Sequence, residues 1–228
     1  MDAEFNEVPV HQPASCKGGE NSSTPESFAA LRRFARSRPE IERCELCGIG
    51  LAPEHPHLLE SGSRQITCSC DACAILFCGK ELAKFLRVPR RILQLECFVI
   101  DDLDWEAMLL PINLAFFLRK PDGRTTAFYP SPAGAMSSLI DLPSWDQLFG
   151  SEPELLSLEP EVEALLVNRI GAQATHFVVP IDECYRLVGV IRTKWRGLSG
   201  GSEVWRAIAD FFTSLEDRAT RIGKTTHA

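Results

Sequence analysis

A cluster of cysteines is the feature that most constrains how this chain can fold. The chain has nine cysteines in 228 residues, and six of them fall within 35 residues. These six are Cys44, Cys47, Cys68, Cys70, Cys73 and Cys78. A secreted disulfide scaffold would be shorter, denser in cysteine and even in cysteine number. The cluster therefore predicts a metal site in a reducing compartment.

Two Cys-x2-Cys pairs supply the best-spaced ligands in this cluster. Cys44 and Cys47 form the first pair, and the following Gly48 lets the chain reverse and turn its amide groups toward sulfur. Cys70 and Cys73 form the second pair, with 22 residues between the two pairs. We predict that these four cysteines bind one metal ion.

Other groups near the two pairs make poorer ligands. Cys68 is the alternative to Cys70, but a Cys-x4-Cys pair is a weaker chelate, and Cys68 also fits a strand in which it would pack. Cys78 lies beyond the second pair and is expected to pack. His55 and His57 lie between the pairs, and His57 as a ligand would displace a better-spaced cysteine.

Four thiolates suit Zn²⁺ or a single iron ion. A rubredoxin-type iron site usually has a glycine after both cysteine pairs, and those glycine amides help to stabilise the ferric charge. Here Cys73 is followed by Ala74. We therefore predict one zinc ion per chain, with iron as the alternative. A closed four-thiolate zinc site supports folding and leaves no open position for catalysis.

Composition excludes several classes of protein. Hydrophobic residues make up 45% of the chain and charged residues 24%, which is enough apolar material for a core. The net charge of −7 argues against a general nucleic-acid binder. Apolar runs fall well short of the ~18 residues of a membrane helix. The acidic N-terminus lacks a signal-peptide pattern, so we expect a cytoplasmic protein that binds neither nucleic acid nor membrane.

The chain divides into three predicted parts. Residues 1–24 are polar and rich in Pro, Ser and Gly, which predicts a disordered arm. Residues 25–87 are predicted to hold a helix and a zinc-ribbon-like metal module. Residues 88–221 are predicted to form an α+β domain that ends in two helices, because strands and helices are mixed there without strict β-α-β alternation.

Hydrophobic periodicity and turn residues place the elements. Pro121-Asp122-Gly123 predicts a hairpin turn, and Pro130–Gly134 is expected to be irregular. The predicted strands are His57–Glu60, Arg64–Cys68, Arg91–Val99, Ile112–Arg119, Thr125–Tyr129, Val162–Asn168 and Thr175–Val179. The predicted helices are Asp104–Leu109, Ser144–Phe149, Pro153–Leu158, a helix capped by Asp182 that runs to about Trp195, and Glu203–Ala219.

Several segments resemble an uncharacterised bacterial family over residues 28–218. They are Cys44–Phe77, Trp145–Leu148, Asp182–Gly189 and Trp195–Gly201. That family is encoded in gene clusters of actinobacterial-type, oxygen-tolerant nickel–iron hydrogenases. The resemblance implies an accessory role in hydrogenase assembly or electron transfer, and it assigns no catalytic residue. The expected function is therefore non-catalytic partner binding, and a rubredoxin-like electron carrier is the alternative.

Charge is distributed unevenly along the chain. Residues 28–91 hold 11 basic and 7 acidic residues, whereas the rest holds 13 basic and 24 acidic residues. This basic excess either neutralises a negatively charged zinc–thiolate centre or docks on an acidic partner protein, such as a hydrogenase subunit or maturation factor. The predicted partner-binding residues are Arg32, Arg33, Arg36, Arg87, Arg90 and Arg91.

Two other segments hold residue types that can carry out chemistry or bind a ligand, but each matches the known pattern poorly. Cys184 and His176 resemble a Cys–His nucleophile pair, but nothing near them forms an evident oxyanion hole, so a buried structural cysteine is expected. Gly197–Gly201 resembles a phosphate loop, but it lacks the lysine and the preceding strand of a P-loop. We predict that the protein is not an enzyme.

Overall fold

The computed structural model describes residues 42–78, 84–138, 142–143, 145–150, 152–171, 174–197 and 199–223. These residues belong to one compact unit. The predicted arm, the helix predicted after it, and Arg32, Arg33 and Arg36 lie outside the described residues.

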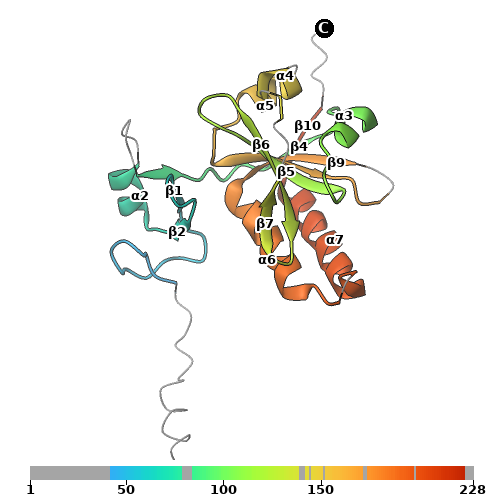
Figure 1. The fold of residues 1–228 in the computed structure, drawn as a ribbon. Coiled ribbons are helices and arrows are strands. Elements are labelled where there is room, and N and C mark those ends of the chain that lie inside the picture. Colours follow the sequence, from blue (N-terminus) through green and yellow to red (C-terminus); the bar gives the residue numbers. More distant parts are fainter. Residues whose placement is uncertain are drawn as a thin grey trace, which may run out of the picture. The chain divides into compact units, whose positions relative to one another are not determined.

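A small antiparallel sheet carries the cysteine-rich segment. Its strands are β1 (His57–Glu60), β2 (Ile66–Cys68) and β3 (Phe85–Arg87), in the order β2-β1-β3. Helix α2 (Asp71–Phe77) follows β2 directly (Figure 1). Leu59 of β1 and Val88, just after β3, are buried in the same hydrophobic cluster as residues of the C-terminal helices.

A seven-stranded sheet forms the larger part of the fold. Its order is β10-β4-β9-β8-β5-β6-β7, and the pairing is antiparallel except between β10 and β4. The strands are β4 (Leu93–Leu95), β5 (Leu114–Arg119), β6 (Thr125–Ser131), β7 (Gly134–Ser137), β8 (Glu163–Asn168), β9 (Thr175–Pro180) and β10 (Thr220–Ile222).

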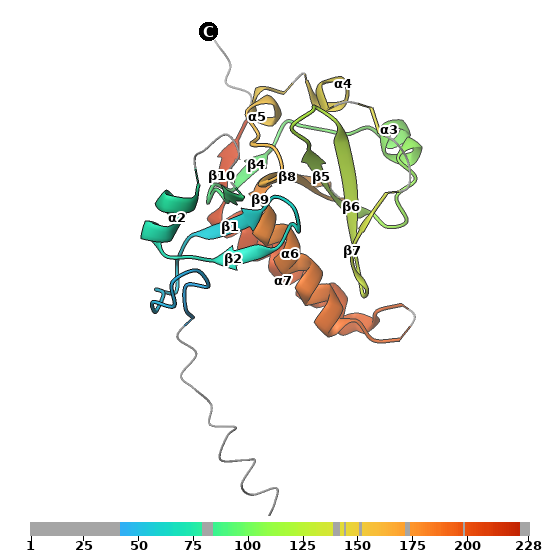
Figure 2. The ribbon, with the colours of Figure 1, turned by 60° about the vertical axis from the view of Figure 1, so that its left-hand side comes forward.

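Helices cover both faces of this sheet. Two long helices, α6 (Ile181–Lys194) and α7 (Gly201–Arg218), lie side by side and pack on one face (Figures 1 and 2). The other face is covered by residues of α3 (Asp102–Ala107), α4 (Trp145–Phe149) and α5 (Pro153–Leu156).

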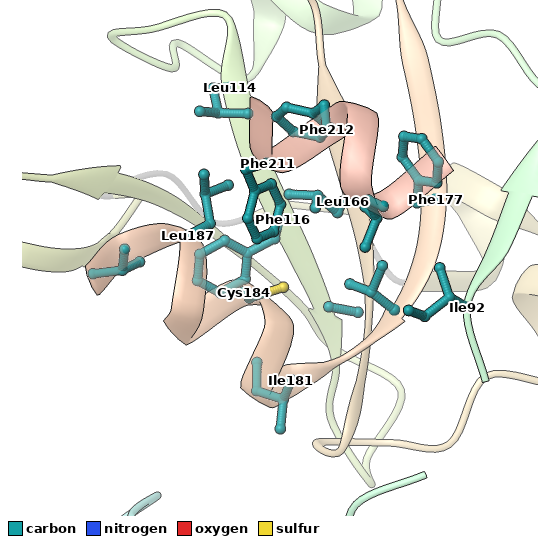
Figure 3. Packing of buried hydrophobic residues seen from close by; sticks show 14 of the residues in the cluster. Ile92, Leu114, Phe116, Leu166, Phe177, Ile181, Cys184, Leu187, Phe211 and Phe212 are labelled. Carbon is teal, nitrogen blue, oxygen red and sulfur yellow. The ribbon is translucent and has the colours of Figure 1, made fainter. Parts of the chain in front are cut away.

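The alternation of β5 explains the two cores. Leu114, Phe116 and Leu118 point toward the cluster under α6 and α7, whereas Ala115 and Phe117 join the opposite cluster. All five side chains are almost completely buried, as expected for a central strand that is covered on both faces. Figure 3 shows the first of these clusters, with Phe116 near its centre.

The predicted α+β fold class is confirmed. The expectation of irregular structure at residues 130–134 is wrong, because β6 extends to Ser131 and a short turn leads into β7. The Ser131 hydroxyl accepts a hydrogen bond from Ala133 N and donates one to Gly134 O. Gly134 has φ +127°, which favours glycine and helps to explain the tight turn.

Candidate metal centre

Four cysteine sulfurs converge in the small module. The Sγ atoms of Cys44, Cys47, Cys70 and Cys73, hereafter the four-cysteine group, all lie within 4.8 Å of one another. Cys44 and Cys73 are buried, and Cys47 is exposed. The predicted ligands are therefore brought together, and the structure selects Cys70 for the group in place of the alternative Cys68.

The first cysteine pair sits in a tight turn closed by backbone hydrogen bonds. Cys44 N donates to Ile49 O at 2.8 Å, and Gly48 N donates to Cys44 O at 2.7 Å. Gly48 has φ +78°, a conformation that strains residues with a Cβ atom. This turn directs the amides of Leu46 and Cys47 toward the Cys44 sulfur and the amide of Ile49 toward the Cys47 sulfur.

The second cysteine pair sits at the start of a helix. Cys70 is the N-cap of α2, and its sulfur accepts a hydrogen bond from Cys73 N at 3.5 Å. Ala74 N donates to Cys70 O at 2.9 Å in the first helical turn. The helix thus holds Cys73 one turn beyond Cys70, and both sulfurs face the first pair, with Cys47 Sγ and Cys70 Sγ 3.7 Å apart.

Electrostatics in this group favour a bound cation. Burial opposes ionisation of Cys44, but the amides of Cys70, Cys47 and Leu46 donate to its sulfur and lower its pKa to about 6. Burial and the neighbouring cysteines raise the pKa of Cys73 to about 12. The Cys44 thiol therefore ionises readily, whereas the Cys73 thiol resists ionisation because of its burial and its cysteine neighbours. A divalent cation would balance the charge of the thiolates.

Cys68 belongs to a second group of candidate ligands. One ring nitrogen each of His55 and His57 and the Cys68 sulfur lie within 4.8 Å of one another. From the sequence, the two histidines are expected only as competitors for the four-cysteine group. The signal that was available is the His-x-His spacing that leads into the strand beginning at His57, since alternate residues of an extended segment share a face. The remaining cysteine of the cluster, Cys78, is partly buried at the C-terminal end of α2.

The described arginines among the predicted partner-binding residues differ in their surroundings. Arg87 is exposed and lies 3.9 Å from the Asp71 carboxylate. Arg90 is also exposed. Arg91 binds Glu163, whose side chain is fully buried, through Nε and one terminal nitrogen, and donates to Ser157 O as well. Arg91 thus holds a buried carboxylate, whereas the ion-pair partner of Arg87 is exposed.

Cys184 and His176 do not form a pair. Cys184 is completely buried in the cluster under α6 and α7, where Figure 3 places its sulfur among Phe116, Leu187 and other apolar side chains. Burial raises the pKa of its thiol. His176 contacts Phe98, a residue of the cluster on the opposite face of the sheet. The two groups are therefore separated by the sheet.

The glycine-rich loop between α6 and α7 has internal partners. Trp195 Nε1 donates to Gly197 O at 2.8 Å, and Trp205 Nε1 donates to Ser199 O at 3.2 Å. Gly200 has φ +84°, and a Cβ atom there would lie 2.8 Å from the Val204 side chain. Close packing therefore explains why residue 200 is a glycine, and no bound phosphate is needed to account for it.

Helix α6 begins one residue before the aspartate predicted to cap it. Its N-cap is Pro180, and Asp182 lies in the first turn. The Asp182 carboxylate is bonded instead to His57 Nδ1 at 2.5 Å and to Glu183 N at 2.8 Å. Asp182 thus links the first turn of α6 to β1.

No helix in the described part of the chain is long and apolar enough to cross a membrane. A search of curated proteins and a search of solved structures found no match to this sequence. A protein-family model does match, over residues 43–219, which include the four-cysteine group and both C-terminal helices. The chain therefore belongs to the family of unknown function DUF5947.

Proposed function

We propose that this protein is a non-catalytic, zinc-binding accessory protein that binds a protein partner during nickel–iron hydrogenase assembly or function. One observation carries the proposal: helix α2, which contains Cys73 and is capped by Cys70, also exposes a run of apolar side chains. Ile75 is 73% exposed, Leu76 68% and Phe77 44%. The hydrogenase context comes from the sequence resemblance alone.

Zinc is the metal that the local backbone favours. In the second cysteine pair, Ala74 N is engaged with Cys70 O as part of the helix. It does not serve as the amide donor to sulfur that would help to stabilise a ferric ion. A zinc ion has no such requirement and accepts four thiolates in a tetrahedron. Zinc held this way fixes α2 to the turn at Cys44–Gly48.

The apolar side chains of α2 support partner binding. A contiguous patch of exposed apolar residues is uncommon on a monomeric protein and marks an interaction surface. Arg87, on the neighbouring strand β3, and Arg90 add positive charge to the same module. An acidic partner surface with an apolar centre would match this arrangement, and its association would weaken with salt.

An iron-based electron carrier is the second candidate, and one observation favours it. Cys47 is exposed, and the turn that holds it has the glycine typical of one half of a rubredoxin site. Colour separates the candidates, because a zinc protein is colourless and a ferric four-thiolate centre is red. Elemental analysis of protein purified from cytosol without added metal should give zinc and no iron.

Partner binding is tested by affinity capture from hydrogenase-producing cells. We expect the wild-type protein to retain a hydrogenase subunit or maturation factor, identified by mass spectrometry. The double variant Ile75→Glu, Leu76→Glu should lose that protein. Leu103→Glu is the matched control, because Leu103 is 78% exposed but lies on α3, away from the cysteine module. Equal recovery by wild type and the double variant, both zinc-loaded, would refute this binding surface.

A further inference from the structure

We propose that His55, His57 and Cys68 form a second zinc site, separate from the four-cysteine group, with an open coordination position. One ring nitrogen of each histidine and the Cys68 sulfur lie within 4.8 Å of one another. This set of two imidazoles and one thiolate suits Zn²⁺, and a site with three protein ligands leaves a fourth position for water or another small ligand. This site does not require the partner proposed above.

Backbone pairing brings the three residues to one face. His57 lies directly opposite Cys68 in the antiparallel β1–β2 pair, so their side chains project from the same side of the sheet. His55 precedes His57 by two residues. Ser69 N donates to Pro56 O at 2.9 Å, which continues the pairing beyond the strands and holds the His55–His57 segment against the Cys68–Cys70 segment.

Hydrogen bonds place a ring proton on Nδ1 of both imidazoles. His55 Nδ1 lies 2.9 Å from Ala52 O, and His57 Nδ1 lies 2.5 Å from Asp182 Oδ2. A carbonyl or carboxylate oxygen only accepts, so Nδ1 carries the proton in each ring. In the neutral rings Nε2 then holds the lone pair. The His57–Asp182 contact is the outer-shell arrangement that orients metal-binding histidines in proteins.

The second nitrogen of His55 gives independent support. The His55 side chain is only 6% exposed, and its Nε2 atom is buried without a hydrogen-bond partner. The Glu42 carboxylate lies 3.5 Å from that nitrogen without forming a hydrogen bond. A buried polar atom with no partner is costly, and a metal ion would satisfy it.

The open position has room for a ligand. A cavity of about 370 Å³ adjoins the two histidines. Its charged lining residues are Glu54, Arg90, Asp182, Glu183 and Arg218. Both histidines border this cavity, so it lies next to the proposed zinc ion. The competing interpretation is that His57 and Asp182 form only an ion pair that holds β1 against α6.

Metal counting separates the two interpretations. Protein saturated with Zn²⁺ and then desalted should contain two zinc ions per chain. Cys68→Ser and His55→Gln should each lower this value to one, with an unchanged circular dichroism spectrum. Cys97→Ser is the matched control and should retain two, because Cys97 is an exposed cysteine outside both groups. A wild-type value of one, or two zinc ions in both ligand variants, would overturn the proposal.

Two further measurements do not depend on removing a ligand. The ¹¹³Cd NMR spectrum of cadmium-loaded wild type should show two signals, one typical of four sulfur ligands and one typical of a single sulfur with nitrogen ligands. Asp182→Asn should weaken the second zinc about 10–100-fold in chelator competition and leave the first unchanged. A single four-sulfur signal, or an Asp182→Asn variant with unaltered zinc affinity, would leave the ion-pair interpretation in place. A wild-type spectrum that shows the sulfur–nitrogen signal but no four-sulfur signal would refute metal binding by the four-cysteine group and would leave the second site standing.

Discussion

Arg91 Nε and one terminal nitrogen bind the two carboxylate oxygens of Glu163 at 2.6 and 2.7 Å, although Glu163 is fully buried. Glu159 N donates to the same carboxylate at 2.8 Å. Glu163 is the first residue of β8, and Arg91 precedes β4, so the pair ties the segment after the small sheet to the centre of the large one. Paired in this way, a carboxylate can stay charged inside the protein.

Arg91→Ala is expected to reduce the free energy of unfolding by about 3 kcal/mol, because it leaves the buried Glu163 carboxylate without its positively charged partner. The value lies at the low end for a buried pair, since the Arg91 side chain is partly exposed. Arg91→Met combined with Glu163→Gln should recover at least half of the loss. Arg90→Ala is the control and should cost less than ~0.5 kcal/mol. Urea denaturation measures all four proteins, and equal losses for Arg90→Ala and Arg91→Ala would contradict this role.

His176 is expected to make the protein sensitive to acid. Burial, together with the charge of Arg169, lowers the pKa of His176 to about 4, from 6.5 in an unfolded chain. Between these pH values the unfolded state binds more protons, so stability from this residue falls as the pH drops from about 6.5 to about 4. The free energy of unfolding should therefore decrease more in wild type than in His176→Gln over that interval. Parallel pH profiles would show that His176 does not contribute.

Cys184→Ala should lower the stability of the protein and leave hydrogen uptake by the cell unchanged. The change removes one sulfur atom from a closed core and leaves a small cavity, which is expected to cost about 1–2 kcal/mol. Thermal or urea denaturation measures this cost. Hydrogen uptake by cells that carry the variant should match that of wild type. Complete loss of hydrogen uptake with a folded, zinc-loaded variant would contradict this prediction and support a reactive role for Cys184.

Local sequence signals were sufficient where the pattern itself carries the structure. Pro121-Asp122-Gly123 predicted the β5–β6 hairpin, and Gly123 indeed has φ +81°. The amphipathic pattern of Glu203–Ala219 predicted most of α7, whose buried residues follow helical spacing. The two Cys-x2-Cys pairs predicted the grouping of four sulfurs for the same reason, because a short spacing fixes which ligands can converge.

Elements that depend on distant partners were not predictable. The strands β3 and β10 have three residues each and exist because they pair with β1 and β4. Helix α2 exposes Ile75, Leu76 and Phe77, so it lacks the apolar periodicity that marks a helix packed on a core. The group of His55, His57 and Cys68 depends on the β1–β2 register, which spacing along the chain does not reveal.

The most direct test of a metal centre at the four-cysteine group is the absorption spectrum of cobalt-substituted protein. The intensity of thiolate-to-cobalt charge transfer grows with the number of bound thiolates, so it reports the sulfur count at the metal. Wild type should show the strong band of four thiolates at one ion, and Cys68→Ser should keep most of it. Cys70→Ser should lose a large part of the band and weaken metal binding. A full band in Cys70→Ser, together with its loss in Cys68→Ser, would contradict the assignment of Cys44, Cys47, Cys70 and Cys73 as the metal ligands.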